Sequence, residues 1–191
     1  MNVIIKSAAF FGSVALLIGV FAGSGSGSRA SLGPDIKTPS DQTKFAAAVA
    51  SARAQYRSAA NELAAGGIRS SRQQAICDAV INQAASDWVG KISRLTTNGD
   101  GKGVIGISIG PNVQIATWNN RMSDIGDRTL IEPDSSVFKT LAKMKVGDTV
   151  KFSGRFTPSR TDCVGEQSFT LQGSMTDPAF TMRFTYIQKL S

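Results

Sequence analysis

The sequence predicts an α+β protein in which an N-terminal apolar segment and a helical hairpin precede a five-stranded β-barrel. Three observations support this. Residues 41–86 are rich in alanine and repeat apolar positions every three or four residues, as helices do. From residue 87 onward, apolar positions instead recur at every second residue, as in strands with one buried face. Residues 141–156 contain both patterns: a short amphipathic helix is followed by a turn at Gly147 and then by an alternating strand.

The N-terminus has the composition of a secretory leader. Residues 1–6 carry Lys6, and residues 7–22 are apolar and uncharged. Compact residues at Val20 and Ala22 place signal peptide cleavage after Ala22. The alternative is a retained membrane anchor, because residues 3–22 supply about the 20 residues that a spanning helix needs. Either alternative predicts a periplasmic or secreted protein, or one anchored in the inner membrane with its bulk outside the cytoplasm.

Residues 23–40 are small and polar and contain Pro34 and Pro39, which is typical of a flexible linker. The linker would join the leader or anchor to the folded part of the chain.

The helical hairpin is expected over residues 41–86. The first helix lacks proline and glycine through Ala65 and should end at Gly66-Gly67. Ser70 and Gln73 form a capping-box pattern for a second helix that extends to about Ala85. The hairpin either packs on the following domain or on its copy in a dimer, or it binds a partner as a coiled segment.

The β-barrel is expected over residues 87–191. Its five strands should cover residues 88–95, 104–109, 113–118, the stretch from Asp148 to Phe156, and 180–187. A short helix capped by Ser135 or Ser136 separates the third and fourth strands. Within the strands, the alternation directs Phe152, Phe156, Phe180 and Phe184 toward the core.

This order of elements, with Gly90 inside the first strand and the sequence KVGDTVKFSGRF leading into the fourth, resembles the OB-fold. The resemblance covers about residues 87–190 and is one of architecture. It implies binding of oligonucleotides, oligosaccharides or proteins on the face of strands two and three and the adjoining loops. Because the phenylalanines are assigned to the core, the chain lacks the row of outward aromatic residues on which nucleic-acid bases stack.

Carried over to this chain, the implied surface begins in the third strand and continues through the loop that follows it. We expect the partner-binding residues to be Gln114, Trp118, Asn119, Asn120, Arg121, Asp124, Asp127 and Arg128. Three roles are open for the polar side chains of this loop: contact with a partner, hydrogen bonding that fixes the loop's own backbone, and coordination of a hard cation. The spacing matches no known calcium loop, so we predict no metal and no cofactor.

Enzymatic activity is not expected. The chain contains no histidine, which removes the commonest general base and the usual serine and cysteine triads. A carboxylate-based hydrolase is the alternative, and it requires two of Asp124, Asp127, Glu132 and Asp134 to face one pocket.

Cys77 and Cys163 are the two cysteines of the chain. In an exported protein they could form a disulfide between the hairpin and the barrel, and the alternative is two unpaired thiols.

The net charge of +7 is spread along the chain. It indicates either a solvated basic surface or a surface that attracts an anionic partner. The sequence as a whole therefore predicts an exported, non-enzymatic binding module that contacts an envelope protein or an anionic polymer. A nucleic-acid-binding protein is the alternative.

Overall fold

The computed structural model describes residues 36–190. The predicted leader or anchor, and the linker through residue 35, lie outside the described residues. Within the described part of the chain, no helix has both the length and the hydropathy to cross a membrane.

The predicted helices and strands follow one another in the predicted order. The elements are α1 (Ser40–Ser58), α2 (Glu62–Ala79), the 3-10 helix η1 (Ile81–Gln83), β1 (Ala84–Thr97), β2 (Gly103–Gly110), β3 (Val113–Ala116), α3 (Ser136–Leu141), β4 (Thr149–Phe156), β5 (Pro158–Ser159), β6 (Cys163–Val164), α4 (Leu171–Thr176) and β7 (Ala179–Lys189). Of these, η1, β5, β6 and α4 are additional short elements. The predicted α+β class is thus confirmed at the level of a helical part followed by a barrel.

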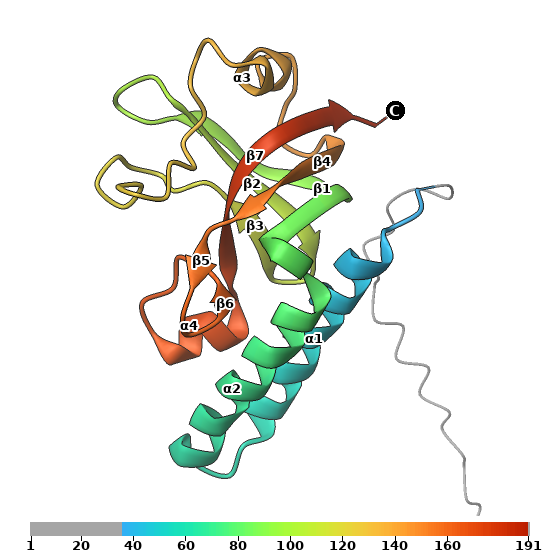
Figure 1. The fold of residues 1–191 in the computed structure, drawn as a ribbon, viewed down its shortest axis with the longest axis vertical. Helices are drawn as coiled ribbons and strands as arrows, with labels where there is room; N and C mark the ends of the chain where they lie inside the picture. The colour runs from blue at the N-terminus through green and yellow to red at the C-terminus, as the bar shows by residue number, and fades with distance from the viewer. Residues whose placement is uncertain (1–35, 191) are drawn as a thin grey trace, which may run out of the picture.

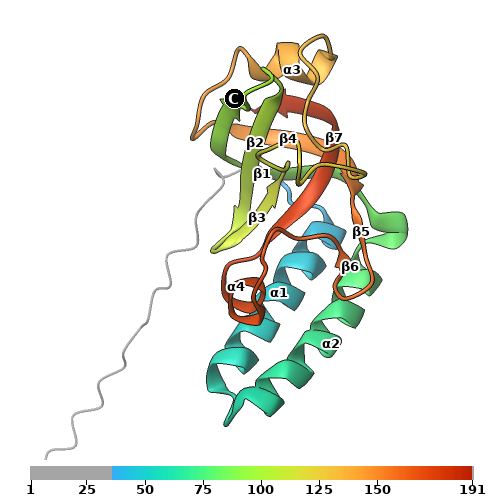
Figure 2. The ribbon, with the colours of Figure 1, turned by 90° about the vertical axis from the view of Figure 1, so that its left-hand side faces the viewer.

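Five strands close into a barrel in the order β1-β2-β3-β7-β4, and β4 returns to β1. Neighbouring strands are antiparallel except β3 and β7, which run parallel. The pair α1 and α2 lies at one end of the barrel, and α3 lies at the other (Figures 1 and 2). The shorter elements β5, β6 and α4 occupy the segment between β4 and β7 and lie beside the helices (Figure 1).

The first strand is long and bent, because it must pair with two neighbours around the barrel. Its register shifts between Ala85 and Trp88 on the β4 side and between Ile92 and Arg94 on the β2 side. Gly90 lies between these bulges, and a Cβ there would be only 2.5 Å from Ile107 Cγ2 and 2.6 Å from the Ser108 oxygen. The glycine thus permits close contact between β1 and β2.

Three predicted boundaries of the hairpin are wrong, and one of them is the capping box, because Ser70 and Gln73 lie inside α2. The first helix ends at Ser58, not near residue 65, because the Asn61 side chain accepts a hydrogen bond from the Ala64 amide and starts α2 there. Gly66 and Gly67 consequently lie inside α2. The second helix ends at Ala79, and residues 84 and 85 already pair with β4, so the barrel begins three residues before the predicted position 87.

The hairpin and the barrel share one hydrophobic core. Phe45 of α1 is fully buried, with its ring centroid 5.2 Å from that of Trp88, 5.5 Å from Phe156 and 4.8 Å from Phe180. Val49 and Ile76 belong to the same cluster as the barrel interior. Packing on the following domain, which was one of the two predicted roles of the hairpin, is therefore observed.

Polar contacts reinforce this packing. The Gln42 side chain donates to the Val89 oxygen (2.6 Å) and accepts from the Val89 amide (2.8 Å), so it pairs with the backbone of β1 as a strand would. Arg53, which is buried, donates to the backbone oxygens of Pro111, Asn112 and Thr176. These bonds satisfy backbone groups that the hairpin covers.

The core assignment of the phenylalanines is largely confirmed. Phe152, Phe156 and Phe180 are buried. Phe184 is only partly buried and packs its ring 5.6 Å from that of Phe152. At the α3 end, the Ser135 side chain accepts from the Phe138 amide, so Ser135 is the cap of the predicted short helix.

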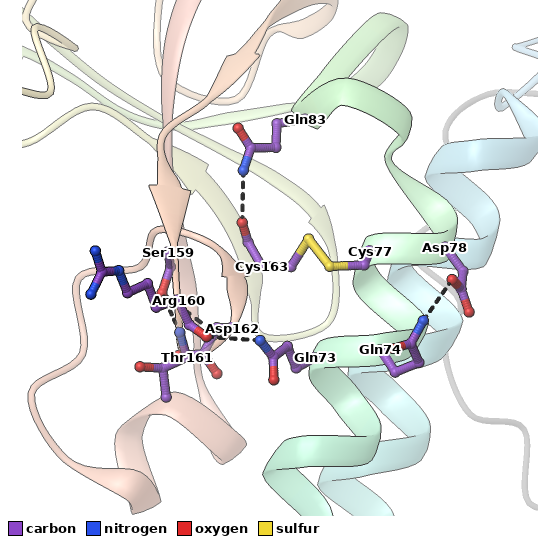
Figure 3. Close-up of a disulfide and its surroundings, with 10 residues drawn as sticks. All are labelled: Gln73, Gln74, Cys77, Asp78, Gln83, Ser159, Arg160, Thr161, Asp162 and Cys163. Carbon is purple, nitrogen blue, oxygen red and sulfur yellow. Dashed lines mark hydrogen bonds between the residues drawn. A yellow bond between two sulfur atoms is a disulfide. The ribbon is translucent and has the colours of Figure 1, made fainter.

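Cys77 and Cys163 form a disulfide that joins α2 to β6 (Figure 3). Two hydrogen bonds lie close to it along the chain: the Gln73 side chain of α2 donates to the Arg160 oxygen (2.8 Å), and the Gln83 side chain of η1 donates to the Cys163 oxygen (3.0 Å). The segment between β4 and α4 is thus fastened to the hairpin.

Candidate functional site

Most of the predicted partner-binding residues lie on one loop, residues 119–128, which leaves the barrel after β3 and is called the 119–128 loop below. Gln114 lies apart from it, within β3, and its side chain accepts a hydrogen bond from the Ser93 hydroxyl. The structure therefore groups the predicted residues after Trp118 and separates Gln114 from them.

Side chains of the loop hold its own backbone in place. Asp124 Oδ1 accepts from the amide and the hydroxyl of Thr129 at 2.6 and 2.7 Å, and its Oδ2 accepts from the Leu130 amide at 3.2 Å. Asn120 Oδ1 accepts from the Ser123 amide at 2.9 Å. Of the three roles left open by the sequence, fixing the loop is the one these two side chains perform.

Three of the four carboxylates of the hydrolase alternative make separate contacts. Asp124 is engaged as just described, and Glu132 accepts from Lys102 Nζ at 2.5 Å. Only Asp127 of the four lines the polar cavity described below. Among residues 36–190, no group of three His, Cys, Asp or Glu side chains is arranged to hold a metal ion.

The fixed loop presents apolar side chains to solvent. Met122 is 82% exposed and Ile125 is 78% exposed. Arg121 and Arg128 are also exposed. A loop whose polar groups are internally bonded while its largest apolar groups face water has the features of a contact surface.

A polar cavity of about 230 Å³ adjoins the base of this loop. It lies between the end of β3, helix α2 and the segment after β4. It is lined by Arg69, Trp118, Asp127, Thr157, Pro158, Ser159, Thr161, Asp162, Gly165, Glu166, Ser168 and Thr181. Two predicted residues, Trp118 and Asp127, therefore belong to it, and Trp118 Nε1 donates to Asp127 Oδ2 at 2.8 Å.

Asp162 is the centre of a buried ion network beside the cavity. Its Oδ1 accepts hydrogen bonds from Arg69 Nε at 2.9 Å and from Arg72 Nη2 at 2.5 Å. Its Oδ2 accepts one from Arg69 Nη2 at 2.5 Å. Burial by itself raises the pKa of Asp162, but hydrogen bonds from the two arginines outweigh it and bring the pKa below its ordinary value. Asp162 is therefore ionised and acts as the counter-ion of both arginines.

Glu166 is in the opposite situation. Neither of its carboxylate oxygens has a hydrogen-bond partner among the described residues, and the nearest guanidinium nitrogens are at 3.6 Å on Arg72 and 3.7 Å on Arg69. Burial raises the pKa of this carboxyl group above its ordinary value. The network thus places a weakly paired acid next to a strongly paired one.

Sequence reasoning did not single out Arg69, Arg72 or Glu166. Asp162 is 93 residues from Arg69 and 90 from Arg72, so no local spacing could connect them. The one available signal was the cysteine pair, because Cys77 lies on the helix of the two arginines and Cys163 follows Asp162 directly.

A scan of the sequence against protein-family models finds no match, and a search of curated proteins finds none either.

Proposed function

We propose that this chain is an exported, non-enzymatic binding module, built on an OB-type barrel, that contacts a protein of the cell envelope through the 119–128 loop. The strand order β1-β2-β3-β7-β4, with a helix between β3 and β4, supports the OB-type assignment. The expected binding surface of such a barrel includes the loop at the end of its third strand.

The observation that carries the proposal is the fixed loop with two exposed apolar side chains. Three hydrogen bonds to Asp124 hold the backbone before any partner arrives, so binding would not have to order it. Full burial of Met122 or Ile125 in an interface would contribute roughly 1.5 to 3 kcal/mol each. Two such anchors within four residues favour a protein partner over a purely charged one.

Two features support a location outside the cytoplasm. The disulfide between Cys77 and Cys163 is of the kind that persists in oxidising compartments. The apolar run of residues 7–22 is typical of a leader or anchor. The protein would be soluble in the periplasm or secreted, or it would be held at the inner membrane through residues 3–22.

The experiment is a comparison of partner capture from envelope extracts. The variant Met122→Ser/Ile125→Ser removes both apolar anchors of the loop, and Leu63→Ser is the matched control because Leu63 is also largely exposed but lies at the start of α2. We expect one protein to be retained by the unmodified chain and by Leu63→Ser, and to be lost with the double variant. Equal retention by all three proteins would contradict the assignment of this surface.

An anionic polymer is the second candidate, because Arg121 and Arg128 are exposed on the same loop. Polymer binding would weaken steeply with added salt and with Arg121→Glu, whereas contact through Met122 and Ile125 would depend little on salt. The salt series therefore separates the two candidates in one set of measurements.

A further inference from the structure

We propose that the polar cavity beside Trp118 binds one uncharged sugar residue. This site is separate from the apolar anchors of the 119–128 loop and goes beyond the protein contact proposed above. It is formed by residues of α2, the end of β3 and the segment between β4 and α4, which the disulfide of Figure 3 fastens to α2.

Glu166 is a buried acid without hydrogen-bond partners among the described residues. It lines the cavity, and its side chain is only 4% exposed. Buried carboxylate oxygens in native structures are normally hydrogen bonded. Both oxygens are covered, so the Glu166 side chain must turn toward the cavity before the hydroxyl donors of a ligand can supply the missing partners.

The side chains that line the cavity include both hydrogen-bond donors and acceptors. Five hydroxyl side chains surround the cavity: Thr157, Ser159, Thr161, Ser168 and Thr181. Hydroxyl groups both donate and accept, as the hydroxyl groups of a sugar do. Arg69 adds a donor, and Asp127 adds an acceptor.

Charge argues against an ionic ligand. An anion would meet the carboxylates of Asp127 and Glu166, and a cation would meet the guanidinium of Arg69. The two positive charges of Arg69 and Arg72 are balanced only when the carboxylates of Asp162 and Glu166 are counted together. An uncharged ligand avoids both repulsions and can use donors and acceptors together.

Aromatic side chains supply the apolar contact that a sugar ring needs. Trp118 is the one aromatic residue among those lining the cavity, and its bond to Asp127 fixes the indole ring. Phe169 follows Ser168 of the lining and is 94% exposed, so it offers a second ring outside the cavity. The C–H face of a sugar packs against such rings, and a neighbouring sugar could contact Phe169.

The volume limits the ligand to one small residue. At about 230 Å³ the cavity is below the roughly 300 to 1,000 Å³ typical of pockets for drug-sized molecules. A longer chain of sugars would therefore place a single unit inside and the remainder along the surface.

The test is titration of the purified full chain with glucose, galactose, mannose, N-acetylglucosamine, cellobiose and di-N-acetylchitobiose. Because Trp88 is fully buried in the core, the tryptophan emission that changes with ligand should be that of Trp118. We expect a saturable change with at least one of these sugars and the same affinity by saturation-transfer NMR. The absence of binding to all six would overturn the proposal.

Variants locate the site. Trp118→Ala, followed by NMR, should weaken binding at least tenfold, and Glu166→Met, which keeps the shape but removes the acceptors, should do the same. Tyr186→Ala is the control, because Tyr186 is an exposed aromatic residue on β7 that does not line the cavity. Circular dichroism checks that each variant is folded, and unchanged affinity in both cavity variants would overturn the assignment.

This assay uses no protein partner, and the capture assay uses no sugar. Failure of one proposal therefore leaves the other to be decided by its own measurement.

Discussion

Removal of the disulfide between Cys77 and Cys163 is the perturbation whose effect can be worked most directly from the structure. The bond closes a loop with a sequence separation of 86 residues. In the chain-entropy treatment, a loop of this length restricts the unfolded chain enough to stabilise the folded state by about 4.6 kcal/mol. The bond joins segments that side-chain hydrogen bonds also hold, so the folded state should survive its loss with a lower free energy of unfolding.

The assay is urea unfolding followed by tryptophan fluorescence. The oxidised protein is compared with the protein kept in reductant and with Cys77→Ser/Cys163→Ser. For a dependence of about 2 kcal/mol per molar urea, the midpoint should fall by about 2 M on reduction. The double variant should unfold where the reduced protein does.

The control is the double variant with and without reductant, which should give one midpoint. If oxidised and reduced protein unfolded within about 0.5 M of each other, the loop-closure argument would be refuted for this bond. Such a result would mean that the unfolded chain already brings the two segments together.

The remaining predictions concern the core and the ion network, and urea unfolding tests each of them. Gly90→Ala should lower the free energy of unfolding by about 1 to 3 kcal/mol, because the added Cβ would overlap β2. Gly66→Ala should raise it by about 0.5 to 1 kcal/mol, because a Cβ there meets no atom within 4 Å. Phe45→Ala should cost about 3 to 5 kcal/mol, because it empties the aromatic cluster at the barrel end; a smaller loss than for Gly90→Ala would contradict the shared core. Asp162→Asn should lower the free energy of unfolding by about 3 to 5 kcal/mol at pH 7, because the buried Arg72 and the partly exposed Arg69 lose their shared counter-ion. In the unmodified chain, the contribution of this low-pKa carboxylate should disappear as pH falls through its folded pKa, below 3.8. The pH dependence due to Glu166 has the opposite sign, because its pKa is raised in the folded chain. The folded state keeps a proton that the unfolded state loses above pH 4.5, so the free energy of unfolding falls as pH rises from 4.5 through the folded pKa. Glu166→Gln should abolish this fall.

The strands of the barrel could be predicted because their signal is local. Val150 and Phe152 alternate with polar neighbours, and the side chains of a strand alternate between faces whatever the rest of the chain does. The loop after Trp118 was predicted for the same reason, because its polar composition and its position after a strand are both visible in the sequence.

Helix boundaries were less predictable because two local signals competed. Gly66-Gly67 indicated the end of the first helix. Instead, Asn61 caps the start of α2, so both glycines lie inside that second helix. Pairing of Ala84 with Arg155 then drew residues expected to be helical into β1. Such pairing is a tertiary contact, and tertiary contacts override local propensity.

The sequence by itself determined the order of elements, the inward phenylalanines and the polar loop, since each depends on periodicity or composition over a few neighbouring residues. Only the tertiary structure decided that Arg69, Asp162 and Glu166 meet beside Trp118, and that Asp124 serves the loop's own backbone. The physical reason is that this cavity is assembled from four segments that lie far apart in the sequence. Its geometry arises from barrel closure and from the fastening of β6 to α2, and neither leaves a repeating pattern along the chain.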